Sequence, residues 1–99
     1  MERGGYIYIL TNKHNTVLYT GVTSNLSQRV WQHRTGQYKS SFTSRYNVTR
    51  LVYFESFLSI EEAISREKQL KAGSRKRKTD LITKHNPDWN DLYDVVAHL

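Results

Sequence analysis

The sequence predicts an α+β fold: a small three-stranded antiparallel sheet flanked by helices, in the order ββαβαα with a short further helix in the tail. Runs of β-branched and aromatic residues recur at three places. Amphipathic segments bounded by capping residues lie between and after these runs. The length of 99 residues fits a single domain. We therefore expect residues 1–99 to form one domain around one core.

Three segments are predicted to be strands: residues 6–10, 17–22 and 48–55. Residues 11–16 are mostly polar, which suits a short hairpin loop between the first two strands. A turn near Lys13 and His14 would place Tyr8 opposite Tyr19 on one face of the sheet. The hairpin is thus expected to present two tyrosines side by side.

Capping residues and glycines delimit three helices. These helices run from a cap at Ser24 or Asn25 to about Arg34, from a cap at Ser59 to about Ala72, and from a cap at Ser74 to about Lys84. Residues 36–47 are polar and are predicted to be a loop. In the tail, apolar residues repeat with the spacing of a short terminal helix: Trp89, Leu92, Val96 and Leu99.

Composition excludes several classes of protein. The chain has no Cys, which excludes disulfide scaffolds and thiolate metal sites. It has no apolar run long enough to span a membrane and no signal-peptide pattern at its N-terminus. We therefore expect a cytoplasmic protein with no membrane partner.

Positive charge is concentrated in one segment. Residues 66–78 hold seven bases and one acid, which accounts for the whole net charge of +6. A basic block of this density attracts polyanions, and nucleic acid is the usual one. The simpler alternative is a solvated helix face that keeps the protein soluble.

One carboxylate falls where an apolar side chain would pack better. Glu67 lies in the apolar stripe of the helix that begins after Ser59. A carboxylate buried there needs a base, a metal or water as its partner. A metal site is one interpretation, and a structural ion pair is the other, with three basic residues within reach: Arg66, Lys71 and Arg29.

A second group of polar residues lies beside the apolar stripe of the first helix. Arg29 and His33 are one turn apart there. If this helix folds back onto the sheet, the hydroxyls of Tyr8 and Tyr19 would lie near both side chains. Each residue alone also has a structural explanation, since arginine pairs with acids and tyrosine packs well in strands. Together the four residues indicate a site.

The order of these residues resembles the GIY-YIG nuclease superfamily. The resemblance is carried by Tyr6-Ile7-Tyr8, by Leu18-Tyr19-Thr20-Gly21, by the segment from Leu26 to His33, and by Arg66-Glu67 on a later helix. Tyr6 takes the place of the glycine in the first motif, and Thr20 that of the isoleucine in the second. The resemblance covers about residues 5–90 and is greatest to the small single-domain bacterial members.

The resemblance implies a catalytic set and a metal ligand. By position, Tyr8 and Tyr19 are similar to the tyrosines of the two motifs. Arg29 is similar to the catalytic arginine, and His33 to the polar residue one turn later. Glu67 is similar to the metal ligand, which implies a divalent cation, Mg²⁺ with Mn²⁺ as an alternative.

These residue types suit the hydrolysis of a phosphodiester. The fork of donors on Arg29 matches phosphate oxygens. A cation on Glu67 would polarise the phosphate and the leaving oxygen, and Mg²⁺ needs few protein ligands. A tyrosine has a pKa of about 10, so it acts as a base only where its surroundings favour the phenolate. We favour Tyr8 for that role, with Tyr19 orienting water or phosphate.

The sequence therefore predicts a metal-dependent endonuclease acting on DNA, with structured or damaged DNA, as in repair and recombination, as the favoured substrate. Nine basic residues are expected to contact nucleic acid: Arg34, Lys39, Arg45, Lys68, Lys71, Arg75, Lys76, Arg77 and Lys78. One alternative is a nucleic-acid-binding module with the same fold and little or no catalytic activity. Another is a protein-interaction module using Asp88, Asp91 and Asp94 with Trp89. No obligate protein partner is expected.

Overall fold

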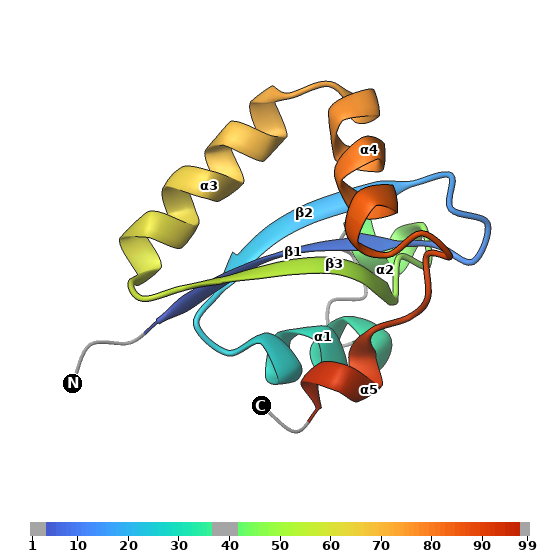
Figure 1. The fold of residues 1–99 in the computed structure, drawn as a ribbon. Coiled ribbons are helices and arrows are strands. Elements are labelled where there is room, and N and C mark those ends of the chain that lie inside the picture. Colours follow the sequence, from blue (N-terminus) through green and yellow to red (C-terminus); the bar gives the residue numbers. More distant parts are fainter. Residues whose placement is uncertain (1–3, 37–41, 98–99) are drawn as a thin grey trace.

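A three-stranded antiparallel sheet forms the centre of the molecule (Figure 1). The computed structural model describes residues 4–36 and 42–97. The strands are β1 (Gly5–Thr11), β2 (Leu18–Thr23) and β3 (Arg50–Phe57). Their order is β2-β1-β3, so β1 is central and β2 and β3 are the edges. The predicted α+β class with a three-stranded antiparallel sheet is confirmed.

The register of the β1–β2 hairpin differs from the prediction by two residues. Tyr8 pairs with Gly21, and Tyr19 pairs with Leu10, so the two tyrosines are not directly opposite each other. The loop has the predicted length but lies one residue later, at residues 12–17, where the Asn12 side chain closes it by accepting hydrogen bonds from the backbone N–H groups of Thr16 (2.8 Å) and Val17 (3.1 Å). A shift of two residues keeps each side chain on the same face, so Tyr8 and Tyr19 still share one.

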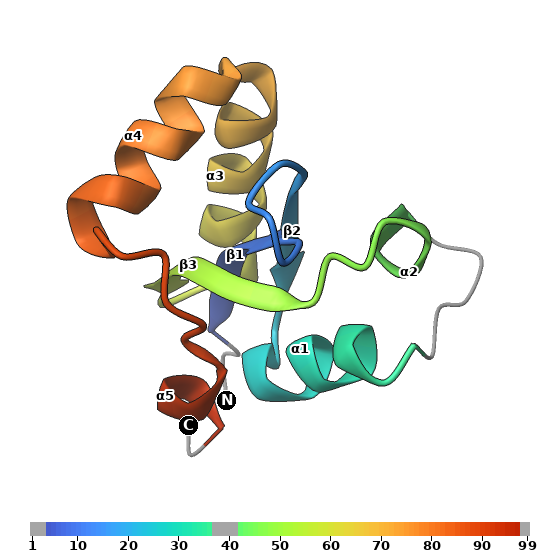
Figure 2. The same ribbon diagram turned by 90° about the vertical axis from the view of Figure 1, so that its right-hand side faces the viewer.

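Helices cover both faces of the sheet (Figures 1 and 2). On one face, α3 (Ile60–Ala72) and α4 (Arg75–His85) pack over a buried core. On the other face, α1 (Leu26–Arg34) and the short α5 (Tyr93–Val96) pack over a second core. The first core includes Ile7, Ile9, Val52, Ala63, Leu70 and Ile82, and the second includes Tyr8, Leu10, Leu26, Val30, Leu51 and Val96. Alternation along β1 sends Tyr8 to the α1 face.

The helices begin at the capping residues that the sequence indicates. The side chain of Asn25 accepts the backbone N–H of Gln28 at 3.2 Å, and those of Ser59 and Ser74 do the same for Glu62 and Arg77. The segment 36–47, predicted to be a loop, contains a one-turn helix, α2 (Phe42–Arg45). The third strand begins and ends two residues later than its predicted range of 48–55.

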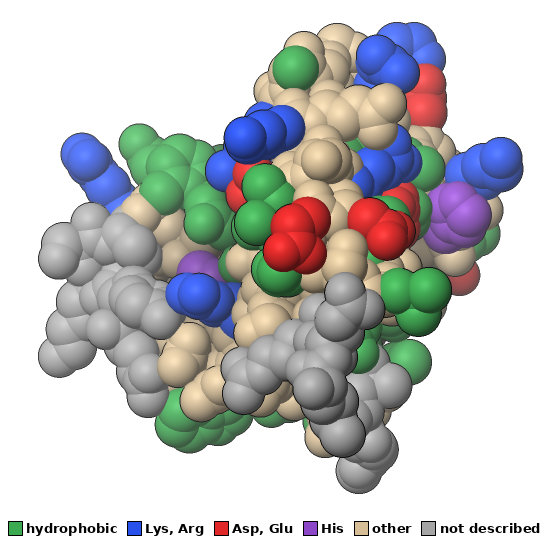
Figure 3. Space-filling model, turned by 90° about the vertical axis from the view of Figure 1, so that its left-hand side faces the viewer, with side chains coloured by type: hydrophobic (Ala, Val, Ile, Leu, Met, Phe, Trp, Pro, Cys, Tyr) green, Lys and Arg blue, Asp and Glu red, His purple; other side chains and the backbone are tan. Residues whose placement is uncertain are grey.

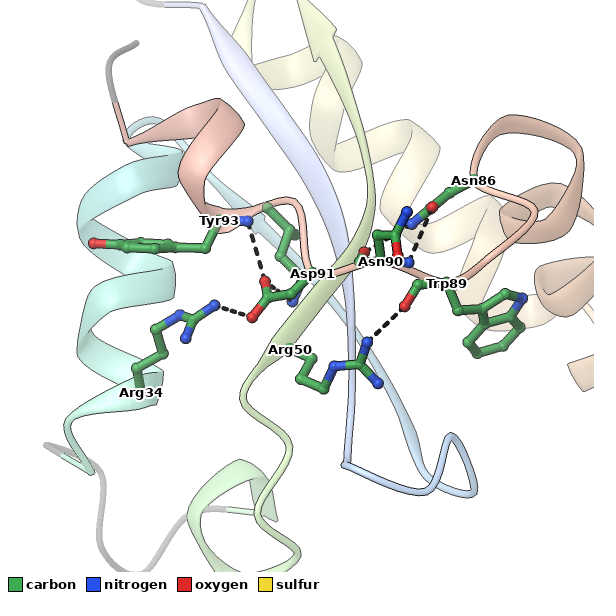
Figure 4. A network of polar contacts seen from close by, with 8 residues as sticks. Arg34, Arg50, Asn86, Trp89, Asn90, Asp91 and Tyr93 are labelled. Atoms are coloured by element: carbon green, nitrogen blue, oxygen red, sulfur yellow. Dashed lines mark hydrogen bonds and ion pairs between the residues drawn. The ribbon is translucent and has the colours of Figure 1, made fainter.

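The tail after α4 is fastened to the sheet by buried and half-buried polar groups (Figure 4). The Asn86 side chain donates to the carbonyls of Val52 (3.0 Å) and Asn90 (2.9 Å). Asp91 accepts the backbone N–H of Leu51 at 3.2 Å and pairs with Arg34 of α1. These contacts hold α5 beside α1 and so complete the α1 face of the sheet.

The predicted terminal helix is short because the chain turns at Trp89. That residue has φ of +52°, outside the helical range, and its side chain packs toward the α4 core instead. Helical geometry resumes only at Tyr93, and Leu92 and Val96 pack on the α1 side. Leu99, the last residue of the predicted apolar repeat, lies outside the described residues.

Candidate active site

Two tyrosines and a histidine meet between the sheet and α1. The hydroxyl of Tyr8, on the central strand, lies 3.3 Å from Nε2 of His33 on α1. The ring of Tyr19 lies 6.3 Å from that of Tyr8 and 5.6 Å from that of His33, measured between centroids. Tyr8 and His33 are buried, whereas Tyr19 is half-buried. The structure thus brings together three of the residues that the sequence singles out.

Gly21 makes room for the Tyr8 ring. A Cβ atom at Gly21 would lie 2.3 Å from both Cζ and the hydroxyl oxygen of Tyr8, far inside any van der Waals contact. The pairing of Tyr8 with Gly21 across the hairpin produces this approach. Glycine is therefore required at this position of the second motif, because any side chain there would displace the Tyr8 phenol from His33.

A threonine that the sequence does not single out completes the chain of polar contacts. Oγ1 of Thr43, on α2, lies 2.8 Å from Nδ1 of His33. If Nδ1 carries the proton and donates to Thr43, Nε2 can accept the hydroxyl proton of Tyr8. Thr43 orients the imidazole for this arrangement. No spacing rule marks Thr43, since it lies in a polar stretch and reaches the site only through tertiary packing.

Burial and a neighbouring cation favour the neutral form of His33. Removal from water lowers the pKa of the imidazole below its usual value, and the positive charge of Arg29, one turn earlier on α1, lowers it further. Arg29 is half-buried beside the same stripe of α1. A neutral imidazole can accept a hydrogen bond from Tyr8, which a charged one cannot.

Because the folded protein disfavours protonated His33, acid should weaken the fold. The unfolded state binds this proton at its ordinary pKa of about 6.5, so stability is present above that pH and is lost as the pH falls below it. We expect the free energy of unfolding to decrease between about pH 7.5 and about pH 5, and His33→Gln to show a smaller decrease. Denaturant titrations of both proteins at the two pH values measure this. An equal decrease in both would contradict it.

Glu67 lies on α3, which packs on the opposite face of the sheet from Tyr8, but its partner Lys71 reaches the free edge of β2 beside Tyr19, where the two faces meet. The Glu67 side chain is only 15% exposed and pairs with Lys71 of the next turn, Nζ to Oε2, at 3.3 Å. Of the three basic partners that the sequence leaves open, the structure has Lys71. Arg66 is engaged elsewhere, in a two-point contact with Glu55 at 3.0 and 3.1 Å.

The surroundings of Glu67 allow a metal with few protein ligands. No group of three or more His, Asp or Glu side chains suitable for a metal occurs among the described residues. A cation at Glu67 would thus have fewer than three such side chains from the described residues and would take its other ligands from water and substrate phosphate. Mg²⁺ keeps much of its hydration shell and is commonly bound in this way. The carboxylate of Glu67 therefore fits a divalent cation that keeps much of its hydration shell.

Some of the basic residues predicted to contact nucleic acid also have partners within the chain. Arg34 pairs with Asp91, and its guanidinium lies 4.4 Å from the ring centre of Tyr93. Arg75 donates to the carbonyl of Asn15 at 3.2 Å. Lys76 pairs with Asp80 at 2.7 Å. Lys68 is exposed on α3, Arg45 lies 5.8 Å from the ring centre of Tyr46, and Lys39 lies outside the described residues.

Other bases line two surface hollows. One lies between α3 and α4 and includes Arg66, Arg77, Lys78 and Lys84 among its lining residues. The second lies at the edge of the sheet, where Tyr19 of β2 is joined by Lys71 and Lys78. Lys78 borders both hollows. Figure 3 shows Lys and Arg spread over much of the face it views, with acidic side chains near its centre and others beside the basic ones.

Comparison with known proteins identifies the family. A GIY-YIG catalytic domain matches residues 4–80, a range that includes both tyrosines, Gly21, Arg29, His33 and Glu67. The chain belongs to the GIY-YIG family. GIY-YIG domains are nuclease domains that act on nucleic acid and generally use divalent metal ions.

Small relatives resemble this GIY-YIG chain over nearly their whole length. A UPF0213 protein of Syntrophus aciditrophicus is 39% identical over 83 residues, which are 84% of this chain and 93% of the relative. One from Pediococcus pentosaceus is 39% identical over 89 residues, 90% of this chain and 92% of that protein. The solution NMR structure of a UPF0213 protein of Bacillus halodurans has a TM-score of 0.56 and 31% identity, covering 89% and 92% of the two chains. The resemblance to small bacterial members is confirmed.

No helix in the described part of this GIY-YIG chain is long and apolar enough to cross a membrane.

Proposed function

We propose that the protein is a metal-dependent endonuclease that hydrolyses phosphodiester bonds in DNA. The observation that carries this proposal is the chain of contacts from Tyr8 to His33 to Thr43, next to Arg29, within a GIY-YIG domain. A buried tyrosine hydroxyl that faces a neutral imidazole has a route for its proton. Folding alone does not require this arrangement, because a phenylalanine in place of Tyr8 would fill the same space without a buried hydroxyl that needs a hydrogen-bond partner.

Tyr8 is the general base of this mechanism. As the attacking water loses a proton to the phenolic oxygen, the hydroxyl proton of Tyr8 passes to Nε2 of His33. His33 is neutral beforehand and so can receive it. Thr43 holds the imidazole in the required orientation through Nδ1. Tyr19, beside both rings, orients the water or the phosphate.

Arg29 stabilises the charge that develops on the phosphoryl oxygens. Its planar guanidinium can donate two parallel hydrogen bonds to phosphate, and its position on α1 is fixed by the packing of Leu26 and Val30. Glu67 would hold the divalent cation. When bound, that cation supplies Lewis-acid stabilisation of the phosphoryl and leaving oxygens.

Structured or damaged DNA, as met in repair and recombination, is the proposed substrate. Contacts from a basic surface read the backbone and shape of DNA rather than its bases. The first turn of α4 carries bases and no acid, whereas that of α3 carries Glu61 and Glu62. Bases at the positive end of a helix dipole destabilise the helix, so the arrangement on α4 favours a bound polyanion.

A nucleic-acid-binding module without efficient catalysis is the second candidate. One observation favours it: the Glu67 carboxylate, which would hold the metal ion, already pairs with Lys71. A cleavage assay on forks, flaps, junctions, intact duplex and RNA, with Mg²⁺, with Mn²⁺ and with EDTA, distinguishes the two. We expect metal-dependent cleavage of the branched or flapped DNA. Binding without cleavage of any substrate would favour the module, and cleavage of RNA alone would contradict the assignment to DNA.

Replacing Arg75, Lys76, Arg77 and Lys78 together by Gln should weaken binding to all DNA sequences alike. The logarithm of the affinity should also depend less steeply on salt, by up to about 0.9 for each duplex phosphate that the variant no longer neutralises. Fluorescence anisotropy over a range of salt concentrations measures both quantities. Unchanged affinity and slope would mean that the block serves solubility alone.

A further inference from the structure

A hollow at the free edge of β2 adjoins the tyrosine site. Its volume is about 320 Å³. Because β2 is an edge strand, residues from both layers of helices can reach this point. The lining residues come from β2, α2, α3 and α4: Leu18, Tyr19, Thr20, Phe42, Lys71 and Lys78. The hollow therefore combines a residue of the candidate active site with one aromatic and two cationic side chains.

One wall of the hollow is aromatic and open to solvent. The Phe42 ring stacks on that of Tyr19, with centroids 6.3 Å apart and an angle of 27° between the planes. Tyr46 packs on Phe42 at 4.8 Å. Phe42 is 47% exposed and Tyr46 is 45% exposed. An aromatic face this exposed, continuous with a catalytic tyrosine, is typical of a binding surface rather than of a core.

The opposite wall carries positive charge. Lys71 comes from α3 and Lys78 from the first turns of α4. Lys71 pairs with Glu67, but the lysine side chain is half-exposed, and ion pairs of this kind contribute little to stability. Its ammonium group can therefore move to a ligand at small cost. The ligand that matches this hollow has a flat ring and an anionic group.

We propose that this hollow binds an unpaired nucleotide of the DNA substrate next to the cleaved phosphate. The base stacks on Phe42, and Lys71 and Lys78 contact the phosphates on either side of it. A base that is paired inside a duplex cannot present its face to a side chain, so the hollow selects DNA with an unpaired nucleotide, such as a flap or a gap. This inference rests on the proposed function and specifies its substrate.

The test uses DNA in which stacking can be seen directly. Two probes are compared, both bound in EDTA so that nothing is cleaved: a duplex with a single-stranded flap of about ten nucleotides and a fully paired duplex. The flap carries 2-aminopurine, whose fluorescence is quenched when it stacks on an aromatic ring, at each position in turn near the branch. We expect the protein to quench the probe at one or two positions.

Two variants show whether Phe42 stacks on the base or only supports the Tyr19 ring. Phe42→Leu keeps an apolar side chain but has no ring, and it should abolish the quenching and weaken binding of the flap by roughly 5- to 150-fold. Its affinity for the paired duplex should change much less. Phe42→Trp should restore both quenching and affinity. Trp31, 48% exposed on α1 and outside the hollow, provides the matched control, since Trp31→Leu should change neither.

Failure of this inference differs from failure of the proposed function. If the protein binds flap DNA but the Phe42→Leu variant gives the same quenching and the same affinity as the parent, the hollow is not the site of the unpaired base. The proposed nuclease function would still stand. Equal weakening of flap and duplex binding by Phe42→Leu would also overturn the inference. If the parent binds neither DNA, both proposals are wrong. Melting curves show whether each variant is folded.

Discussion

Tyr8→Phe is expected to lower the rate of DNA cleavage by roughly 10²- to 10⁴-fold, the usual effect of removing a general base. The change removes a single oxygen and leaves the ring over Gly21, so the sheet and α1 should keep their positions. The proton route to His33 is lost with the hydroxyl. Affinity for DNA in EDTA should be close to that of the parent, because Tyr8 is buried and its role is in the reaction.

Two controls show whether a loss of activity in Tyr8→Phe comes from a damaged fold rather than from the missing hydroxyl. His33 loses a hydrogen-bond partner in Tyr8→Phe, which costs about 1–3 kcal/mol if nothing replaces it, so stability must be measured alongside the rate. Tyr6→Phe is the matched control, two residues earlier on the same strand and the same face, and should cleave normally. A folded Tyr8→Phe protein that cleaves within a few fold of the parent would exclude Tyr8 as the base.

Local signals were sufficient to predict most of the fold. Ser59 and Ser74 were predictable as helix caps because a capping hydrogen bond joins a side-chain oxygen to a backbone N–H group three residues later. Such a local contact does not depend on the rest of the fold. The alternation of Tyr8 with Ile7 and Ile9 predicts two faces of one strand, and the structure has them in separate cores. Arg29 and His33 were predictable as neighbours because helical periodicity alone brings them together.

The features that sequence reasoning missed depend on tertiary contacts. The predicted hairpin register was wrong because the Asn12 side chain closes the loop over residues 12–17, one residue later than the predicted loop. Thr43 and Phe42 come from a one-turn helix that is held by packing, with no periodicity to indicate it. The pairing of Arg34 with Asp91 joins residues 57 positions apart. No pattern within either segment predicts the pair.

Glu67→Gln is expected to abolish metal-dependent cleavage while DNA binding persists. Glutamine has nearly the same shape as glutamate but lacks the negative charge that holds a divalent cation. The change should have little effect on stability in the absence of metal, about 0.5 kcal/mol or less, because the only ion pair at Glu67 in the described residues is with the half-exposed Lys71. Loss of activity would then not come from loss of the fold.

Metal-dependent melting distinguishes a metal ligand from half of an ion pair without any measurement of activity. At Mg²⁺ concentrations about ten times the dissociation constant, binding should stabilise the parent by about 1.4 kcal/mol, and Glu67→Gln should show no such gain. Lys71→Gln is the matched variant, since it breaks the same ion pair but keeps the carboxylate. It should retain the stabilisation by Mg²⁺, and its affinity for Mg²⁺ should rise because the competing ammonium is gone.

The opposite pattern would assign Glu67 to the fold. If Glu67 were needed chiefly for its ion pair, Glu67→Gln and Lys71→Gln would lose similar amounts of stability with and without Mg²⁺, and both would still cleave DNA. A Glu67→Gln protein that cleaves DNA normally would exclude Glu67 as the metal ligand, whatever its melting temperature. The metal would then have to be held by other groups, and the nuclease proposal would rest on Tyr8, His33 and Arg29 alone.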